Sequence, residues 1–135
     1  MGGAIKVLTR GDLITINRRM IERFGGIFFT NNDNLANPGS LEYVLEAIQG
    51  SLFGHDLFPT ILEKAATIGF RTIEGHVFHD GNKRTGMEAC RLFLELNGYE
   101  MRIDREVIEV AIKAASNQIV FEEFVQWLAS RIKPL

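Results

Sequence analysis

The residues best suited to chemistry lie within twelve consecutive positions, residues 75–86, whose sequence is GHVFHDGNKRTG. A histidine exchanges protons near neutral pH, so His76 is suited to take the proton of an attacking hydroxyl. Asp80 offers the hard oxygen ligand that Mg²⁺ takes when phosphates also bind the ion. Gly81 lacks a Cβ atom, which lets a phosphate approach the backbone closely. These three residues indicate chemistry at a phosphate group.

The next three residues add hydrogen-bond donors and positive charge. Asn82 can donate from its side-chain amide, Lys83 is a point charge, and Arg84 can form paired hydrogen bonds with phosphate oxygens. The stretch is expected to join two helices, and the free N–H groups and dipole of a helix N-terminus bind anions. A base, a metal ligand, anion donors and a cation are together the components of phosphoryl or nucleotidyl transfer.

Each of these residues also has a purely structural interpretation. A histidine at a helix C-terminus is often only a cap that interacts with the helix dipole, and Asp80 is compatible with a plain N-cap. Lys83 and Arg84 are compatible with a solvated helix face. Phe78 is best explained as a core anchor that pins the loop. The occurrence of all these residue types in one short stretch favours the functional interpretation.

The elements that must position the stretch are mainly helices. Hydrophobic periodicity, caps and glycine stops predict six helices, with an asparagine-rich loop at 27–38. The alternating sequence YEMRI, residues 99–103, is the one clear strand signal, and residues 51–58 form a connector or a short hairpin. The helices are expected at about 12–24, 40–50, 59–76 and 83–97, then after a cap at Asp104, and at 121–132. The fold class is therefore mainly all-α.

Composition restricts the remaining possibilities. The chain has 135 residues, of which 46% are hydrophobic and 24% charged, and this suits one compact domain over residues 1–135. No apolar run is long enough to span a membrane, and the N-terminus lacks the pattern of a signal peptide. A net charge of −2 argues against direct nucleic-acid binding. The single Cys90 cannot form an internal disulfide, which favours the reducing cytoplasm.

The sequence HVFHDGNKRTG resembles the signature loop of the Fic/Doc family, His-x-Phe-x-Asp/Glu-Gly/Ala-Asn-Gly/Lys-Arg. The flanking sequences PTILEKAATIGFRTIEG and RLFLELNGYEM are similar to the corresponding helices of its Doc (death-on-curing) branch, and the likeness covers roughly residues 9–130. The resemblance implies a compact helical bundle of about six helices with a short flap or β-hairpin. All six diagnostic positions match, namely His76, Phe78, Asp80, Gly81, Asn82 and Arg84.

The resemblance also implies roles for the matching residues and two cofactors, ATP and Mg²⁺. His76 would be the general base, Arg84 would pair with a nucleotide phosphate as the second catalytic residue, and Asp80 would hold Mg²⁺. Phe78 would anchor the loop. The connector at about 50–58 would be the flap that aligns a target segment by strand-like pairing. The phosphates would bind to a nest formed by Gly81, Asn82 and Lys83, next to Arg84.

Two positions distinguish the chain from the AMP-transferring majority of the family. That majority usually has Gly where Lys83 stands, and a second Arg where this chain has Met87. Both differences resemble the Doc branch, whose best-known activity moves the γ-phosphate of ATP, bound in a reversed sense, to a threonine of a translation elongation factor. A Doc-like toxin with a protein substrate of this kind is therefore expected, with Fic-type AMP transfer (protein adenylylation) as the alternative.

Regulation is expected to come from another protein. Many members of the family inhibit themselves through a Ser/Thr-x-x-x-Glu-Gly/Asn motif, and no such motif occurs in this sequence. Its absence fits a toxin that is restrained by a separate antitoxin, and it fits equally a protein that has no inhibitor.

Two other classes of protein compete with this interpretation. An HD-type metal phosphohydrolase would use the ordered set His55, His79-Asp80 and Asp104, although the spacings of 24 residues are short for that fold. Under this alternative His79 is essential and Arg84 is incidental. A non-catalytic interaction domain that kept the loop without turnover is the other alternative.

Overall fold

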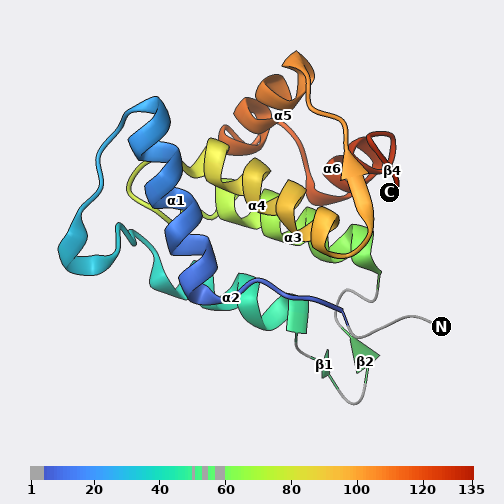
Figure 1. Ribbon diagram of the computed structural model, residues 1–135, viewed down its shortest axis with the longest axis horizontal. Coiled ribbons are helices and arrows are strands. Elements are labelled where there is room, and N and C mark those ends of the chain that lie inside the picture. The colour runs from blue at the N-terminus through green and yellow to red at the C-terminus, as the bar shows by residue number, and fades with distance from the viewer. Residues whose placement is uncertain (1–4, 50, 53–54, 57–59) are drawn as a thin grey trace.

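A computed structural model describes residues 5–49, 51–52, 55–56 and 60–135. The described residues form mainly helices, as the sequence predicts, with two small antiparallel sheets, β1–β2 and β3–β4 (Figure 1). The helices are α1 (Arg10–Phe24), α2 (Pro38–Gln49), α3 (Ile61–Glu74), α4 (Asn82–Leu96), α5 (Arg105–Ala115) and α6 (Phe121–Ala129). The strands are β1 (Ser51–Leu52), β2 (His55–Asp56), β3 (Tyr99–Met101) and β4 (Ile132–Pro134), and a 3₁₀ turn spans Thr30–Asn32.

Helices α3 and α4 cross at the centre of the molecule, and the other helices surround them (Figure 1). Helix α3 contacts α2, α4, α5 and α6, while α1 packs on α4. The crossing is close because two glycines face each other, and a Cβ atom on Gly86 would lie 2.8 Å from the carbonyl oxygen of Gly69. The small residues of α3 therefore have the packing role that their spacing predicts, and they bring the C-terminus of α3 next to the N-terminus of α4.

The predicted starts of the first two helices are wrong by two residues each. Helix α1 begins at Arg10 with Thr9 as its N-cap, and Asp12 belongs to a capping box. Thr9 Oγ1 accepts from Asp12 N at 3.1 Å, and Asp12 Oδ2 accepts from Thr9 N at 2.8 Å. Helix α2 begins at Pro38, a favoured first position, rather than after Ser40.

The helices on either side of residues 75–86, and helix α5, begin or end close to their predicted bounds. Helix α3 begins at Ile61 with Thr60 as its N-cap, and Pro59 lies outside the described residues. The same helix ends at Glu74, so His76 follows the helix rather than ending it. Helix α5 begins directly after Asp104, whose side chain accepts from Glu106 N at 3.0 Å, and the predicted cap is confirmed.

The predicted last helix extends three residues too far. Helix α6 ends at Ala129, and Ile132–Pro134 instead form β4, which pairs antiparallel with β3. Arg131 lies between the helix and this strand, and its guanidinium is buried, with Nη1 2.6 Å from Asp104 Oδ2 and Nη2 2.7 Å from Glu106 Oε2. The strand predicted at 99–103 is present as β3.

Part of the predicted hairpin at residues 51–58 is present as a pair of short strands. Strands β1 and β2 pair with Ser51 opposite Asp56 and Leu52 opposite His55, while residues 50, 53–54 and 57–58 of the expected flap lie outside the described residues. Within the part of the chain that the structure describes, no helix is both long and apolar enough to cross a bilayer.

Candidate functional site

The loop between α3 and α4 is held by the asparagine-rich segment that precedes α2. Ala36 N and Asn37 N both donate to Val77 O, at 2.9 and 3.1 Å, and His79 N donates to Asn34 O at 2.8 Å. The Asn37 side-chain amide donates to His76 O at 2.8 Å. His76 is exposed and has a left-handed backbone, with φ of 46°, which is uncommon outside glycine and therefore needs this external support.

Phe78 and Asn82 hold the loop in place from the side that faces the core. The Phe78 ring is only 1% exposed and belongs to the main hydrophobic core. Asn82 Oδ1 accepts from Phe78 N at 2.8 Å, and Asn82 Nδ2 donates to Phe78 O at 2.7 Å. The side chain that sequence reasoning assigned to phosphate binding is therefore used mainly to close the loop, and its amide keeps one N–H for another partner.

The N-terminus of α4 has free backbone N–H groups of the kind that bind anions. Gly81 is the N-cap and has a left-handed φ of 77°, and the first intrahelical bond runs from Thr85 N to Gly81 O at 2.9 Å. The backbone N–H groups of Asn82, Lys83 and Arg84 precede that bond, so they are the donors that a bound anion can use. A hollow of about 140 Å³ lies beside them, lined by Met20, Ile21, Gly25, Asp80, Gly81, Asn82, Lys83 and Arg84.

Asp80 lies at the edge of this hollow and is held by two backbone amides. Its Oδ2 accepts from Ile27 N at 3.0 Å, and its Oδ1 accepts from Gly81 N at 2.8 Å. Each oxygen retains a lone pair for a cation. The described side chains contain no group of three His, Cys, Asp or Glu residues that would hold a metal by themselves. A metal at Asp80 would therefore need ligands from a substrate and water, which is the usual way in which Mg²⁺ binds beside phosphates.

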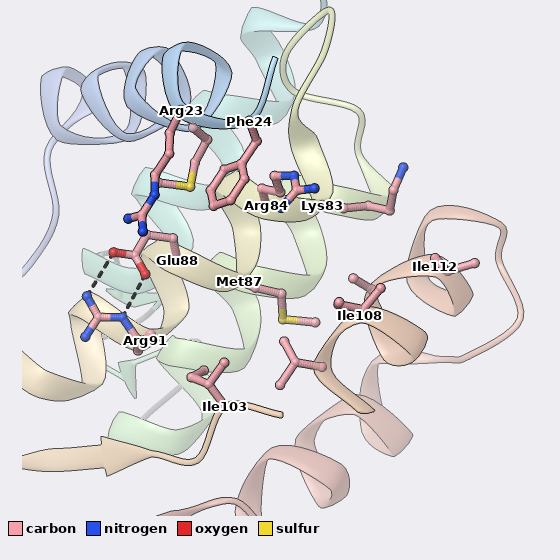
Figure 2. A pocket seen from close by; sticks show the side chains of 13 residues that line it. Arg23, Phe24, Lys83, Arg84, Met87, Glu88, Arg91, Ile103, Ile108 and Ile112 are labelled. Carbon is pink, nitrogen blue, oxygen red and sulfur yellow. Dashed lines mark hydrogen bonds and ion pairs between the residues drawn. The ribbon is translucent and has the colours of Figure 1, made fainter. Parts of the chain in front are cut away.

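Two exposed cations, Lys83 and Arg84, stand on the first turn of α4. The Arg84 guanidinium lies 4.0 Å from the centre of the Phe24 ring, so the aromatic ring fixes the position of the cation. Beyond Arg84 a larger cleft of about 470 Å³ runs between the C-terminus of α1, α4 and α5 (Figure 2). Met87 lines this cleft and is 6% exposed, while Ile103, Ile108 and Ile112 line its opposite wall (Figure 2).

Two buried asparagines support the site, and sequence reasoning missed both. Asn17 of α1 and Asn34 of the loop that precedes α2 are fully buried. Asn17 Nδ2 donates to Asp80 O at 2.9 Å and to Thr85 Oγ1 at 3.0 Å, and Asn34 Nδ2 donates to Asn17 Oδ1 at 3.0 Å. The sequence did contain a signal for Asn17, because this polar residue lies beside Ile16 on the inward side of an amphipathic helix. A polar side chain that is buried there must find hydrogen-bond partners.

The residues of the rival phosphohydrolase site do not gather in the described structure. His79 is exposed, with its ring 5.1 Å from the Phe29 ring and its Nε2 3.3 Å from Asn32 Nδ2. Asp104 caps α5 and forms an ion pair with Arg131. The side chain of His55 lies outside what the structure describes. The described residues therefore contain no metal site of the kind that the phosphohydrolase alternative requires.

Comparisons with known proteins agree with the signature loop. The model of the Fic/DOC family matches residues 7–94. The chain is 29% identical over 108 residues to "Protein kinase doc" of Escherichia phage P1, which covers 80% of this chain and 81% of that protein. It is also 29% identical over 92 residues to "Toxin Doc" of Mycolicibacterium smegmatis, covering 68% and 71%. The chain therefore belongs to the Fic/DOC family, and its relatives place it in the Doc branch.

Proposed function

We propose that this protein is a Doc-like toxin that transfers the terminal phosphate of ATP to a hydroxyl side chain of a target protein, such as a translation elongation factor. The observation that carries the proposal is the anion nest at the start of α4, where Gly81 opens the helix beside Asp80, Lys83 and Arg84. One relative is named a protein kinase and the other a toxin, which supports the same activity.

The reaction follows from the chemistry of the loop residues. The nest and Arg84 bind the phosphates of ATP, and His76 accepts the proton of the target hydroxyl. A bond forms between the hydroxyl oxygen and the γ-phosphorus, while the bond from that phosphorus to the bridging oxygen breaks and ADP leaves. Arg84 and the helix dipole stabilise the negative charge that spreads over the transferred group.

Mg²⁺ is the proposed cofactor, and Asp80 is the residue that would hold it. The ion, when bound, supplies positive charge that neutralises the phosphate oxygens. The carboxylate of Asp80 lines the hollow, and the amides of Ile27 and Gly81 hold it there. This arrangement fixes the carboxylate beside the phosphates that would complete the coordination of the ion.

Two features of α4 support phosphate transfer over AMP transfer. Lys83 is exposed on the first turn of the helix and adds a cation beside the nest. Met87 is almost fully buried and presents an apolar wall to the cleft, at the position where AMP-transferring members carry a second arginine. An apolar wall offers nothing to the additional phosphates that such an arginine binds.

The proposed partners are a protein substrate and a separate antitoxin, since the sequence contains no self-inhibitory motif. The β1–β2 hairpin, part of the expected flap, is the proposed site where the target segment pairs. A target in the translation machinery implies that the protein acts in the cytoplasm.

Labelled ATP tests the proposal directly. Purified protein, Mg²⁺ and a bacterial lysate are incubated with ATP that carries its label in either the γ- or the α-phosphate. We expect the γ-label on a protein band and no α-label, with the signal lost in His76→Ala and retained in His79→Ala. Transfer of the α-label alone would establish AMP transfer instead. No transfer of either label, or loss only in His79→Ala, would contradict the proposed roles.

A further inference from the structure

We propose that Asn17 is a positioning residue that orients the Asp80–Gly81 peptide and thereby builds the anion nest, with Asn34 holding Asn17 in place. The inference rests on the proposed function, because it concerns the phosphate site of the same reaction. Asn17 lies 63 residues before Asp80 in the sequence, and its side chain is fully buried.

The contacts of Asn17 leave one orientation for its amide. One neighbour is the carbonyl oxygen of Asp80, at 2.9 Å, and a carbonyl can only accept. The nitrogen of the amide must therefore face Asp80, and its second N–H reaches Thr85 Oγ1 at 3.0 Å. The oxygen then faces Asn34, whose Nδ2 donates to it at 3.0 Å. All the hydrogen-bonding atoms of the Asn17 side chain thus have partners.

The orientation of Asp80 O determines the direction of Gly81 N–H, the donor that holds the Asp80 carboxylate beside the nest. The described chain has no cis peptides, and in a trans peptide the C=O and N–H groups point in opposite directions. Because Asn17 draws Asp80 O toward the core, Gly81 N–H points outward. This N–H donates to Asp80 Oδ1 at 2.8 Å and so fixes the carboxylate at the edge of the hollow. Without Asn17 the half-buried carbonyl would lose this partner, and rotation of the peptide would relieve the cost.

Asn34 is suited to support Asn17 from the outside. It has a left-handed backbone, with φ of 61°, and is fully buried. Its Oδ1 accepts from Phe29 N at 3.0 Å, while its carbonyl accepts from His79 N. Asn34 therefore contacts the signature loop directly, through its backbone bond with His79 N, and indirectly, through its side-chain bond with Asn17.

Gly81 fits closely against the same residue. A Cβ atom at this position would lie 3.1 Å from Asn17 Nδ2 and 3.3 Å from Ile21 Cγ1. The left-handed φ of Gly81 and the contact with Asn17 therefore belong to one arrangement, in which α1 supports the turn that opens α4.

Three variants test the inference by ATP affinity, measured calorimetrically with Mg²⁺. Asn17→Ala is expected to raise the Kd for ATP about tenfold, because the Asp80–Gly81 peptide that opens α4 and holds the Asp80 carboxylate loses its support. Asn34→Gly keeps the left-handed backbone and removes the hydrogen bond to Asn17, together with the bond from Phe29 N, and a rise of about threefold is expected. Ile16→Val is the control, since it removes one methyl group from the neighbouring buried position of α1 and leaves the peptide untouched.

The control separates positioning from general loss of stability. Both Asn17→Ala and Ile16→Val are expected to lower Tm, and only the first is expected to weaken ATP binding. Wild-type affinity in Asn17→Ala, or an equal loss in Ile16→Val, would overturn the inference. If Asn17→Ala does not fold, the ATP affinity of Asn34→Gly decides whether the inference holds. An unchanged Kd in Asn34→Gly would then contradict the positioning of Asp80 through Asn34 and Asn17.

A readout without nucleotide separates this inference from the proposed function. Hydrogen exchange of the Gly81 amide is measured by NMR in the ligand-free variants. Asn17→Ala is expected to accelerate this exchange about tenfold beyond any change in Ile16→Val, because the peptide is no longer held. Absence of ATP binding in the wild type would contradict the proposed function alone, while unchanged Gly81 exchange in Asn17→Ala would contradict the positioning role.

Discussion

At the scale of single residues, the two glycines after α1 have different roles even though both have positive φ. The φ angle is 93° at Gly25 and 128° at Gly26. A Cβ atom on Gly25 would meet nothing within 4 Å, whereas one on Gly26 would lie 2.8 Å from Asp80 Oδ2. From the sequence the pair is only a helix stop, and the structure adds that Gly26 leaves room for the carboxylate proposed to hold Mg²⁺.

Gly25→Ala and Gly26→Ala therefore form a matched pair. Each is expected to lower the free energy of unfolding by about 1–3 kcal/mol, because alanine is strained at positive φ. Only Gly26→Ala is expected to displace Asp80, and it should raise the Mg²⁺ concentration needed for half-maximal ATP binding several-fold. Urea unfolding and a Mg²⁺ titration measure the two effects. Equal Mg²⁺ requirements in both variants would show that the space at Gly26 does not matter for the metal.

At the scale of elements, the crossing of α3 and α4 depends on the absence of a side chain at Gly86. A Cβ atom there would lie 2.7 Å from Ile73 Cγ1 and 2.8 Å from Gly69 O, and the backbone oxygen cannot move aside. We expect Gly86→Ala to destabilise the protein by about 2–3 kcal/mol through overpacking, despite the better helix propensity of alanine. Chemical denaturation provides the measurement.

Gly39 of α2 is the control for helix propensity. Nothing lies within 4 Å of the position that its Cβ would occupy, so Gly39→Ala is expected to be neutral or to stabilise by up to about 1 kcal/mol. A similar small gain in Gly86→Ala would mean that the two central helices separate easily and that the close crossing has no energetic importance.

The ion pair between α5 and the end of α6 predicts how stability depends on pH. Contact with the Arg131 guanidinium lowers the pKa of the Asp104 carboxyl. A lowered pKa in the folded state stabilises the protein above the unfolded value of about 3.9, and this contribution is lost as the pH falls through the folded value. Asp104→Asn should therefore be less stable than the wild type at pH 7, and the difference should narrow below about pH 4.

Urea unfolding at pH 7, 5 and 3 checks this dependence. Glu100→Gln is the control, because Glu100 pairs with Lys133 at 3.5 Å in a largely exposed ion pair that contributes little. A gap between Asp104→Asn and the wild type that stays constant from pH 7 to pH 3 would contradict the assignment to charge, since asparagine caps a helix as well as aspartate does.

At the scale of the whole molecule, local signals predicted the elements, and apart from the starts of α1 and α2 the features that were missed depend on long-range contacts. Periodicity placed all six helices, and the cap at Asp104 was correct because a cap depends on its own neighbours. The end of α6 was wrong because Ile132–Pro134 pair with Tyr99–Met101, far earlier in the sequence. The signature loop was found from its residue types. Its support by Asn17 was not found, since that contact spans 63 residues.

The same long-range packing makes Cys90 a reporter of unfolding of the whole molecule. Cys90 is fully buried on α4 near the crossing, and burial raises the pKa of its thiol to about 12. Reaction with a thiol reagent needs the exposed thiolate, so the native protein is expected to react at least about 10³-fold more slowly than the urea-unfolded chain. Gly86→Ala should accelerate the native reaction by about 30–150-fold, the factor that corresponds to its expected destabilisation.

The measurement is the labelling rate at pH 8, with Cys90→Ser as the blank. Rapid labelling of the native protein, or equal rates with and without the Gly86 substitution, would mean that α4 exposes Cys90 by local opening, and the central crossing would then not be the most stable part of the fold.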